Sequence, residues 1–309
     1  MRPIRIGIIG FGKIAADQHV PSIAANPRLE LAATSSRSGQ GVAAIYSDWR
    51  ELLDKVNGLE AIAITTPPSV RYEIARECIE KGLHVLLEKP PAVTLSEVEE
   101  LSCLAEAKGV TLFATWHARH NPAVSAAAQA LAGKRIAGMR IVWHEDVHKW
   151  HPGQNWIWEP GGFGVFDPGI NAFSIATAIF PGALFVRSAE LSFPANADTP
   201  IAAEIAFASD VADGALNCSL DWRRTEGQEW TIDVATADDR SVRLTQGGAR
   251  LILDGEEQNA GGPGEYPDIY REFVDLIDQG RSSVDVRPLR LVADSFLASR
   301  RRTVEPVAM

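Results

Sequence analysis

This sequence has few cysteines, no long apolar stretch and no excess of basic residues. Each of these features excludes a class of protein. The only three cysteines are Cys78, Cys103 and Cys218. They lie far apart without close-paired metal spacing, so we expect reduced core residues in a cytoplasmic protein. No run of about 18 apolar residues could span a bilayer, and no basic-then-apolar signal precedes the first predicted strand. We therefore expect no membrane association.

Charge and composition exclude two further classes of protein. A net charge of -10 argues against a generic nucleic-acid-binding protein, which needs a basic face for phosphates. Hydrophobic residues make up 46% and charged residues 23%, which is typical of a chain that folds throughout rather than of a disordered one. At 309 residues, the chain has room for two domains of roughly 100 to 200 residues each.

The N-terminus carries a dinucleotide-binding pattern in its expected context. Residues 4–9 are an apolar run that predicts a buried strand, and Gly10-Phe11-Gly12-Lys13-Ile14-Ala15 follows before a helical pattern. Gly10 permits a tight turn, Gly12 lets the backbone approach a pyrophosphate, and Ala15 lets the helix pack closely on the strand. The helix N-terminus offers its amides to the phosphates, so Lys13 and Ile14 join the predicted cofactor-binding residues.

The end of the second predicted strand bears on the choice of cofactor. After residues 29–34, the segment Ser35-Ser36-Arg37-Ser38 stands where an NAD-selective protein usually has an acidic residue. The guanidinium of Arg37 and the hydroxyl of Ser36 are donors that match a 2′-phosphate. We expect NADP to be accepted, with use of NAD as well left open; a solvated loop arginine is the alternative.

The alternation of strands and helices continues to about residue 114. Ser96 is the expected N-cap of the last of these helices, with Glu99 completing a capping box and Gly109 ending the helix. The loop residues Thr66 and Pro67 follow a strand and could border the nicotinamide ribose, although a plain turn fits equally well. Helices are predicted at 48–53, 69–81 and 96–108, and strands at 61–65, 84–87 and 111–114.

The segment Leu86-Leu87-Glu88-Lys89-Pro90-Pro91 ends the fourth predicted strand. Its apolar run stops at a charged pair and two prolines, which cannot donate ladder hydrogen bonds. Ligands of open α/β sheets bind outside the carboxyl ends of the strands, so Glu88 and Lys89 are candidates for the cofactor site. A solvated lysine before a turn is the alternative.

The second half predicts a different architecture. After a helix through Leu131, short β-branched or aromatic runs separated by turn residues indicate a largely antiparallel sheet. The runs are 140–147, 191–193, 203–208, 214–220, 230–235, 242–244 and 251–253, and helices are predicted at 169–180, 268–279 and 288–302. The predicted fold class is α/β, with a doubly wound parallel Rossmann sheet in residues 1–120 and a second α+β domain with an open sheet in residues 121–309, for substrate binding and oligomerisation. The C-terminal helix could pack back on the first domain.

One apparent metal motif is rejected. His144-Glu145-Asp146-Val147-His148 spells the zinc-protease pattern H-E-x-x-H, which requires a helix. The preceding residues 140–143 are β-branched and aromatic and predict a strand, on which the two histidines would be about 13 Å apart at roughly 3.3 Å per residue. We therefore expect no metal.

Three motifs together resemble the Gfo/Idh/MocA oxidoreductase family. They are the glycine turn, Glu88-Lys89-Pro90, and the run from Gly161 to Asn171 that contains Asp167. The resemblance covers the whole chain and implies a Rossmann domain joined to an open-sheet domain, with Lys89 facing the nicotinamide. Asn171 stands where this family commonly has a histidine. That departure, with the segments around His117, Glu145, His151 and Trp158, is similar to the aldose 1-dehydrogenase branch, whose members oxidise a pyranose such as L-arabinose or D-galactose at C1 to the lactone.

The missing histidine leaves the proton acceptor to be assigned. Neutral Asn171 cannot take the C1 hydroxyl proton, so Asp167 and Lys89 are the candidates. A lysine base would need its pKa lowered from about 10.4 toward roughly 7 to 8. If the two side chains are adjacent, Asp167 is the simplest base and Lys89 polarises the C1 oxygen, with the reverse assignment left open.

A monosaccharide requires hydrogen-bonding groups beside aromatic rings. We expect His117, Glu145, His151 and Asn171 to bind hydroxyls, and Trp150 and Trp158 to cover C–H faces. His117 and Glu145 could instead be satisfied strand residues, and either tryptophan could be core or interface.

Two other functions also fit the sequence. One is a non-catalytic NADP-binding regulator, because a fold alone does not imply catalysis. The other is a family oxidoreductase that acts on another sugar carbon or on a cyclitol. An open sheet face that needs covering also predicts a homodimer.

Overall fold

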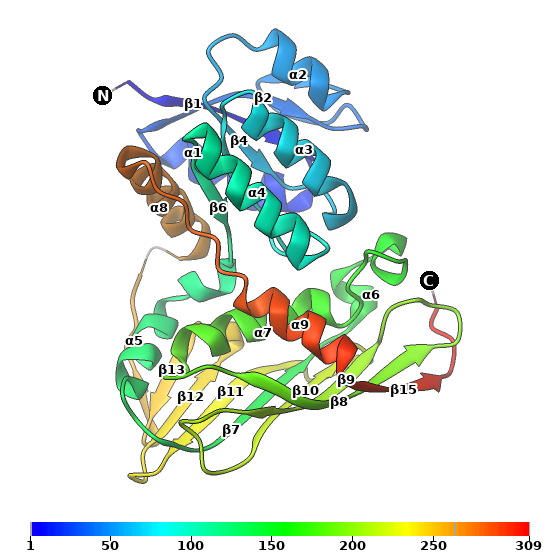
Figure 1. Ribbon diagram of the computed structural model, residues 1–309, viewed down its shortest axis with the longest axis vertical. Coiled ribbons are helices and arrows are strands. Elements are labelled where there is room, and N and C mark those ends of the chain that lie inside the picture. Colours follow the sequence, from blue (N-terminus) through cyan, green and yellow to red (C-terminus); the bar gives the residue numbers. More distant parts are fainter. Residues whose placement is uncertain (1, 263, 309) are drawn as a thin grey trace. The chain divides into compact units, whose positions relative to one another are not determined.

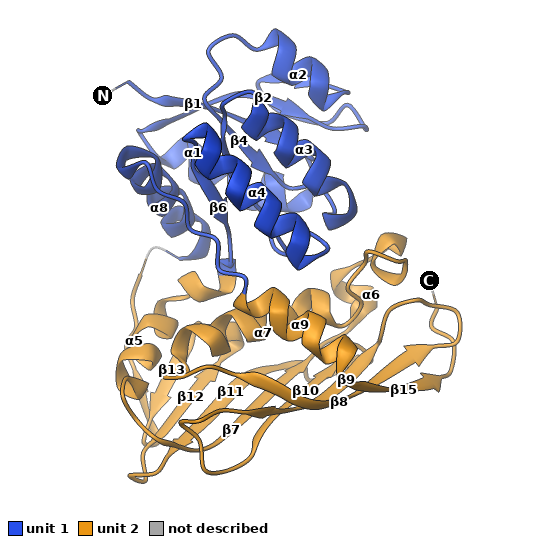
Figure 2. Ribbon diagram, viewed as in Figure 1, with its two compact units in different colours: residues 1–117, 264–286 blue, residues 118–263, 287–309 orange. Residues whose placement is uncertain are grey.

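The computed structural model describes residues 2–262 and 264–308 and divides into two compact units. Unit 1 comprises residues 1–117 and 264–286, and unit 2 comprises residues 118–263 and 287–309 (Figure 2). This division differs from the two continuous segments proposed from the sequence, because a late segment returns to the first unit. That segment carries helix α8 (Glu265–Gln279).

Unit 1 is built on a six-stranded sheet with the order β3-β2-β1-β4-β5-β6 (Figure 1). All its neighbouring strands run parallel. The order reverses direction between β1 and β4, which makes their carboxyl ends the expected ligand crevice. The strands are β1 (Ile4–Ile9), β2 (Leu29–Ser35), β3 (Ala44–Tyr46), β4 (Ala61–Ile64), β5 (His84–Leu87) and β6 (Leu112–Ala114).

Helices cover both faces of this sheet, which is why its central strands are apolar on both faces. Tyr270 and Phe273 of α8 share one buried core with Ile6 and Ile8 of β1. The opposite core includes Ile74 of α3. The remaining helices are the π-helix η1 (Ala15–His19), α1 (Val20–Ala25), α2 (Trp49–Lys55), α3 (Pro68–Glu80) and α4 (Leu95–Lys108).

Two details of α4 differ from the prediction. Thr94 is the N-cap, and its capping box is completed by Glu97, so the proposed Ser96–Glu99 box is wrong by two residues. Gly109 does end the helix, with a φ of +66°. Cys103 is exposed on this helix, whereas Cys78 and Cys218 are buried as expected.

Unit 2 contains a nine-stranded sheet with the order β14-β13-β12-β11-β7-β10-β9-β8-β15. Most neighbours are antiparallel, while β7 with β10 and β8 with β15 run parallel. The strands are β7 (Ile136–His144), β8 (Phe185–Pro194), β9 (Ala202–Ala208), β10 (Leu216–Asp221), β11 (Glu229–Thr236), β12 (Ser241–Thr245), β13 (Arg250–Leu253), β14 (Glu256–Gln258) and β15 (Ser299–Val304).

The helices of unit 2 lie over one face of the sheet (Figure 1). These are α5 (Pro122–Leu131), α7 (Phe166–Ile179) and α9 (Arg287–Leu297), while α6 (Val147–Trp150) is a single turn after β7. In the part of the chain that the structure describes, no helix covers the opposite face. None of the described helices is long and apolar enough to cross a membrane.

Three predicted boundaries in unit 2 are corrected. The strand expected at 140–147 ends at His144, because Asp146 caps α6 through the amide of His148. Helix α7 begins at Phe166 and therefore includes Asp167 in its first turn. The helix expected at 288–302 ends at Leu297, and the chain continues as β15, whose backbone pairs with the edge strand β8.

Candidate active site

The glycine turn after β1 has the geometry of a dinucleotide site. Gly10 has a φ of +100°, and a Cβ added to it would lie 2.7 Å from the backbone nitrogen of Thr66. A Cβ on Gly12 would meet no described atom within 4 Å. Gly10 is therefore required by the turn itself, whereas the space at Gly12 is left for something outside the chain.

The surroundings of this turn fit a nicotinamide dinucleotide. The helical segment begins directly after Gly12, whose carbonyl accepts from the amide of Ala16, so its first amides point out of the helix end. The hydroxyl of Thr66 is buried and has no hydrogen-bond partner among the described residues. The loop of Thr66 and Pro67 thus lies beside Gly10 and presents an unsatisfied polar atom there, while its contact with the nicotinamide ribose stays a prediction.

The loop after β2 presents cationic and hydroxyl groups. Arg37 is exposed and forms no ion pair with any described carboxylate. The hydroxyl oxygens of Ser36 and Ser38 lie 2.8 Å apart. This donor set fits a 2′-phosphate, because no acidic side chain within the loop opposes it.

Lys89 follows β5 and is tied to a buried carboxylate. One oxygen of Glu88 accepts from the backbone nitrogen of Lys89 at 3.0 Å. The other accepts from the hydroxyl of Tyr266 at 2.9 Å and lies 3.1 Å from Nε2 of His19. Both oxygens of Glu88 are thus engaged inside unit 1, and its predicted contact with the cofactor stays a prediction.

The electrostatics keep Glu88 ionised. Burial alone would raise the pKa of its carboxyl group, but the hydrogen bond from His19 and the charges of His19, His117 and Arg71 outweigh it and lower the pKa to about 2. Arg71 of α3 is itself buried and donates to the backbone carbonyls of Thr66, Glu88 and Pro90. It clamps the loop after β4 to the loop after β5, a role that sequence reasoning missed.

His117 is held by a residue of α8. Its Nδ1 lies 3.0 Å from a carboxylate oxygen of Glu265, and its ring is stacked on that of Tyr266 at 5.9 Å. Burial would lower the pKa of His117, but the hydrogen bond and charge of Glu265 raise it above its ordinary value. His117 does not lie in a strand. Its Nδ1 atom already has a partner, Glu265, within unit 1.

Unit 2 brings together Asp167 and His151. Asp167 is buried in the first turn of α7, and its Oδ2 lies 3.4 Å from Nε2 of His151. Asn171 is one turn further along the same helix face. Its Oδ1 is buried and lacks a hydrogen-bond partner among the described residues. The sequence singled out all three residues but did not predict the contact between His151 and Asp167.

Glu145 lies at the centre of a tryptophan cluster in unit 2. It is buried, and its two oxygens accept from the indole nitrogens of Trp222 at 3.1 Å and Trp230 at 2.8 Å. The ring of Trp222 lies 5.3 Å from that of Trp158 and 5.2 Å from that of His151. Trp222 and Trp230, which sequence reasoning missed, therefore connect the predicted sugar-binding residues.

The two predicted aromatic covers differ in exposure. Trp158 is only 5% exposed and forms part of the wall, whereas Trp150 is 43% exposed. Trp150 lies 5.6 Å from Trp230, and its indole donates to Gln228 at 3.1 Å. The Nζ of Lys149 lies over the Trp150 ring, 5.0 Å from its centroid, so Trp150 is a partly exposed ring at the edge of the cluster.

The apparent zinc motif is not on one helix. His144 is the last residue of β7 and lies 2.9 Å from the hydroxyl of Ser219, while His148 lies in α6. Both histidines were expected on one strand, which is wrong for His148. Among the described residues, no group of three or more His, Cys, Asp or Glu side chains is arranged to hold a metal ion.

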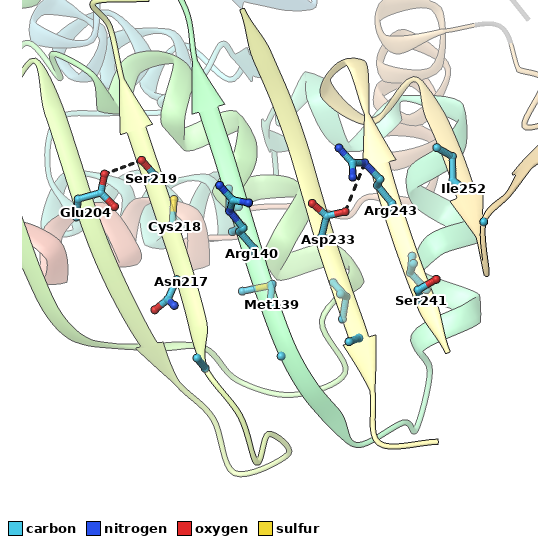
Figure 3. Close-up of a pocket in the computed structure, with 17 residues that line it drawn as sticks. Met139, Arg140, Glu204, Asn217, Cys218, Ser219, Asp233, Ser241, Arg243 and Ile252 are labelled. Carbon is cyan, nitrogen blue, oxygen red and sulfur yellow. Dashed lines mark hydrogen bonds and ion pairs between the residues drawn. The ribbon is translucent and has the colours of Figure 1, made fainter. Parts of the chain in front are cut away.

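The open face of the unit 2 sheet has a hollow of about 780 Å³ that lies apart from these groups (Figure 3). Arg243 and Asp233 are 3.5 Å apart on it, and Ser219 donates to Glu204 at 2.6 Å. Arg140 also points onto this face. The hollow therefore carries charged side chains of both signs among apolar ones such as Met139 and Ile252.

A parallel Rossmann sheet with a glycine turn, a lysine at a strand end and a second unit with a histidine–aspartate pair define a nicotinamide-dependent oxidoreductase. A family model for oxidoreductases with an NAD-binding Rossmann fold matches residues 4–116. The chain is 44% identical to galactose 1-dehydrogenase from Pseudomonas fluorescens over 311 aligned positions, which cover 99% of each protein. The chain belongs to the Gfo/Idh/MocA family.

Solved structures show the same likeness. A D-galactose-1-dehydrogenase from Rhizobium etli superimposes with a TM-score of 0.94 at 46% identity, covering 100% of this chain and 99% of the other. A 3-ketoreductase from Actinomadura kijaniata, solved with NADP and TDP-benzene, gives a TM-score of 0.84 at 17% identity and covers 98% and 100%. The second likeness shows a shared fold alone.

Proposed function

We propose that this protein is a D-galactose 1-dehydrogenase that oxidises the C1 hydroxyl of the pyranose to the lactone. The observation that carries the proposal is the likeness to two galactose 1-dehydrogenases over the full length of both units. It therefore includes unit 2, where the His151–Asp167 pair and the tryptophan cluster lie.

The reaction moves one hydride and one proton. The C1 hydrogen leaves with its electron pair, the C1 hydroxyl loses its proton, and the C1–O bond becomes the carbonyl of the lactone. NADP+ or NAD+ supplies the hydride acceptor when bound. The chain has to provide a proton acceptor, a group that holds the C1 oxygen, and contacts that orient the ring.

Asp167 is the proposed proton acceptor. A buried carboxylate next to an imidazole can pass the proton on to it. The 3.4 Å contact supports this use of His151, in addition to its predicted contact with a sugar hydroxyl. Lys89 is proposed to polarise and position the C1 oxygen. The reverse assignment, with Lys89 as base, remains the alternative.

Asn171 supports the sugar assignment most directly. A buried acceptor without a partner costs about 1 to 3 kcal/mol, and a sugar hydroxyl would remove that cost. Glu145, whose carboxylate accepts from two indoles, is proposed to bind a sugar hydroxyl as well. The partly exposed ring of Trp150 is proposed to cover the apolar C–H side of a pyranose. His117 is proposed to contact the substrate through Nε2.

We also propose a second substrate, a preferred cofactor and an oligomeric state. L-Arabinose shares the ring stereochemistry of D-galactose and lacks its hydroxymethyl group, so we propose it as a second substrate. NADP is the proposed preferred cofactor because Arg37 and Ser36 suit a 2′-phosphate. We further propose a cytoplasmic homodimer, in which the open face around Arg140 and Asp233 meets a second copy, since both signs of charge on it allow self-complementary pairing.

A panel of aldoses and cyclitols with both cofactors tests the proposal. Formation of NADPH or NADH is followed at 340 nm, and the product is identified as a lactone. We expect D-galactose and L-arabinose to give the two highest values of kcat/KM in the panel. Oxidation of a cyclitol, or of a sugar at a carbon other than C1, at a higher kcat/KM would overturn the proposal, and so would cofactor binding without turnover of any compound in the panel.

A further inference from the structure

An unusual helical segment follows the dinucleotide turn. Residues Ala15–His19 form a π-helix, a rare geometry that is frequent at functional sites. Its last residue, His19, is completely buried. Both ring nitrogens of His19 have partners: Nδ1 lies 2.7 Å from the hydroxyl of Tyr270, and Nε2 lies 3.1 Å from Glu88.

Helix α8 completes this buried group. Tyr266 and Tyr270 are four residues apart and so lie on the same face of the helix. The ring of Tyr266 meets the ring of His19 edge-on at 5.0 Å, and its hydroxyl donates to the same oxygen of Glu88 that His19 approaches. Two segments far apart in the sequence thus converge on one carboxylate.

The arrangement is costly if its only purpose is stability. An ionised carboxylate that is 5% exposed loses most of its hydration, and apolar residues of similar volume often stabilise a core equally well. What an apolar residue could not do is accept from the backbone nitrogen of Lys89, as the second oxygen of Glu88 does at 3.0 Å.

We propose that His19 and Tyr266 are positioning residues, which hold the Glu88 carboxylate where it fixes the backbone of Lys89 and hence the direction of the lysine side chain. Tyr270 acts one step further away by orienting the ring of His19. None of these three side chains has to touch substrate or cofactor. The functional consequence rests on the role proposed above for Lys89.

Tyr266→Phe isolates the hydroxyl while keeping the ring that packs on His19 and His117. We expect kcat for D-galactose to fall about tenfold, with the KM for sugar and for cofactor changed less than about twofold. Tyr72→Phe removes a tyrosine hydroxyl from α3 of the same unit, away from Glu88, and is the matched control with unchanged kcat. In a Lys89→Ala background, Tyr266→Phe should cause no further loss, because it acts through the lysine.

Hydrogen exchange provides a readout that needs no turnover. A peptide that starts at Leu86 and runs past Pro91 reports the amides of Glu88 and Lys89 in this stretch, because the first two residues of a peptide lose their label and prolines have no amide hydrogen. Tyr266→Phe should speed exchange there about tenfold, and His19→Ala should do the same, whereas His19→Gln, which can still donate to Glu88, should retain part of the protection.

These experiments distinguish a network that positions Lys89 from one that only stabilises the fold. A lower Tm with unchanged kcat and unchanged exchange at Lys89 would show a purely structural network and overturn the positioning role. An equal fold-loss from Tyr266→Phe with and without Lys89 would also overturn it. If Lys89→Ala itself keeps normal turnover, the proposed function of the lysine fails, while the exchange measurement still decides whether the network holds its backbone. If Tyr266→Phe does not fold, the two His19 variants supply the same comparison.

Discussion

Gly10→Ala should lower stability and Gly12→Ala should weaken cofactor binding, although both glycines belong to one turn. A Cβ at position 10 would lie 2.7 Å from the backbone nitrogen of Thr66 and 2.8 Å from its Cγ2, on a residue whose φ is +100°. A Cβ at position 12 would meet no described atom within 4 Å, and φ there is not in the left-handed range. Alanine at position 10 should therefore destabilise the fold, whereas alanine at position 12 should weaken only the binding of the cofactor.

The magnitudes follow from these contacts. Left-handed backbone costs a residue with a Cβ about 1 to 2 kcal/mol, and forcing an atom into packed surroundings costs about 1 to 3 kcal/mol more. Gly10→Ala should thus lower the free energy of unfolding by about 2 to 5 kcal/mol, a fall in Tm of roughly 4 to 20 °C. Gly12→Ala should leave Tm within about 2 °C but weaken cofactor binding at least tenfold, or about 1.4 kcal/mol, because its methyl group lies where the pyrophosphate passes.

Two measurements on each purified variant decide the matter. Thermal unfolding without cofactor gives Tm, and titration with NADP and NAD, followed by fluorescence, gives Kd. The reasoning is refuted if Gly12→Ala binds both cofactors as tightly as the wild type, or if it loses as much Tm as Gly10→Ala.

Two further predictions concern charge. Arg37→Ala should raise the KM for NADP about tenfold and leave the KM for NAD unchanged, because only NADP carries the 2′-phosphate that the guanidinium would bind; equal effects on both cofactors in steady-state kinetics would contradict this. Glu265→Gln should lower the pKa of His117, which NMR titration of the imidazole can measure. Because the folded pKa is raised above the ordinary 6.5, the stability from this pair is complete below pH 6.5 and is lost as pH rises through the folded value, so the variant's deficit in Tm should be larger at pH 6 than at pH 9. A deficit that grows with pH would show that the sign is wrong.

The Rossmann sheet was predictable because its strands are buried on both faces. Ala61–Ile64 and His84–Leu87 are continuous apolar runs, which a parallel sheet under two helical layers requires. β3 was missed because it is three residues long and largely exposed, so no burial pattern marks it. The capping box slipped because Thr94 with Glu97 and Ser96 with Glu99 match the same pattern two residues apart.

The end of the chain shows where local preference gives way to tertiary contacts. Arg300, Arg301 and Arg302 favour helix by intrinsic propensity, and the sequence prediction extended a helix through them. In the structure they lie in β15, because the edge of β8 offers backbone partners that are remote in sequence. Arg301 also covers the ring of Phe193 on β8 at 5.2 Å, which no sequence pattern indicates.

Some residues of the candidate site could be predicted from the sequence, and others could not. Residues in compact motifs, such as Gly10, Lys89 and Asp167, could be singled out from the sequence because their chemistry and spacing are local. Their partners could not, since the hydrogen bond between Tyr266 and Glu88 joins residues 178 positions apart. A histidine soon after a dinucleotide turn, such as His19, is a sequence signal that could have pointed to this network.

The turnover of Lys89→Ala and Asp167→Asn with D-galactose tests the central claim most directly. Each variant should lower kcat at saturating sugar and cofactor by at least about a hundredfold, the lower range for the loss of an acid–base group, while Tm stays near that of the wild type. Turnover within about threefold of the wild type in either variant would contradict the roles proposed for Lys89 and Asp167.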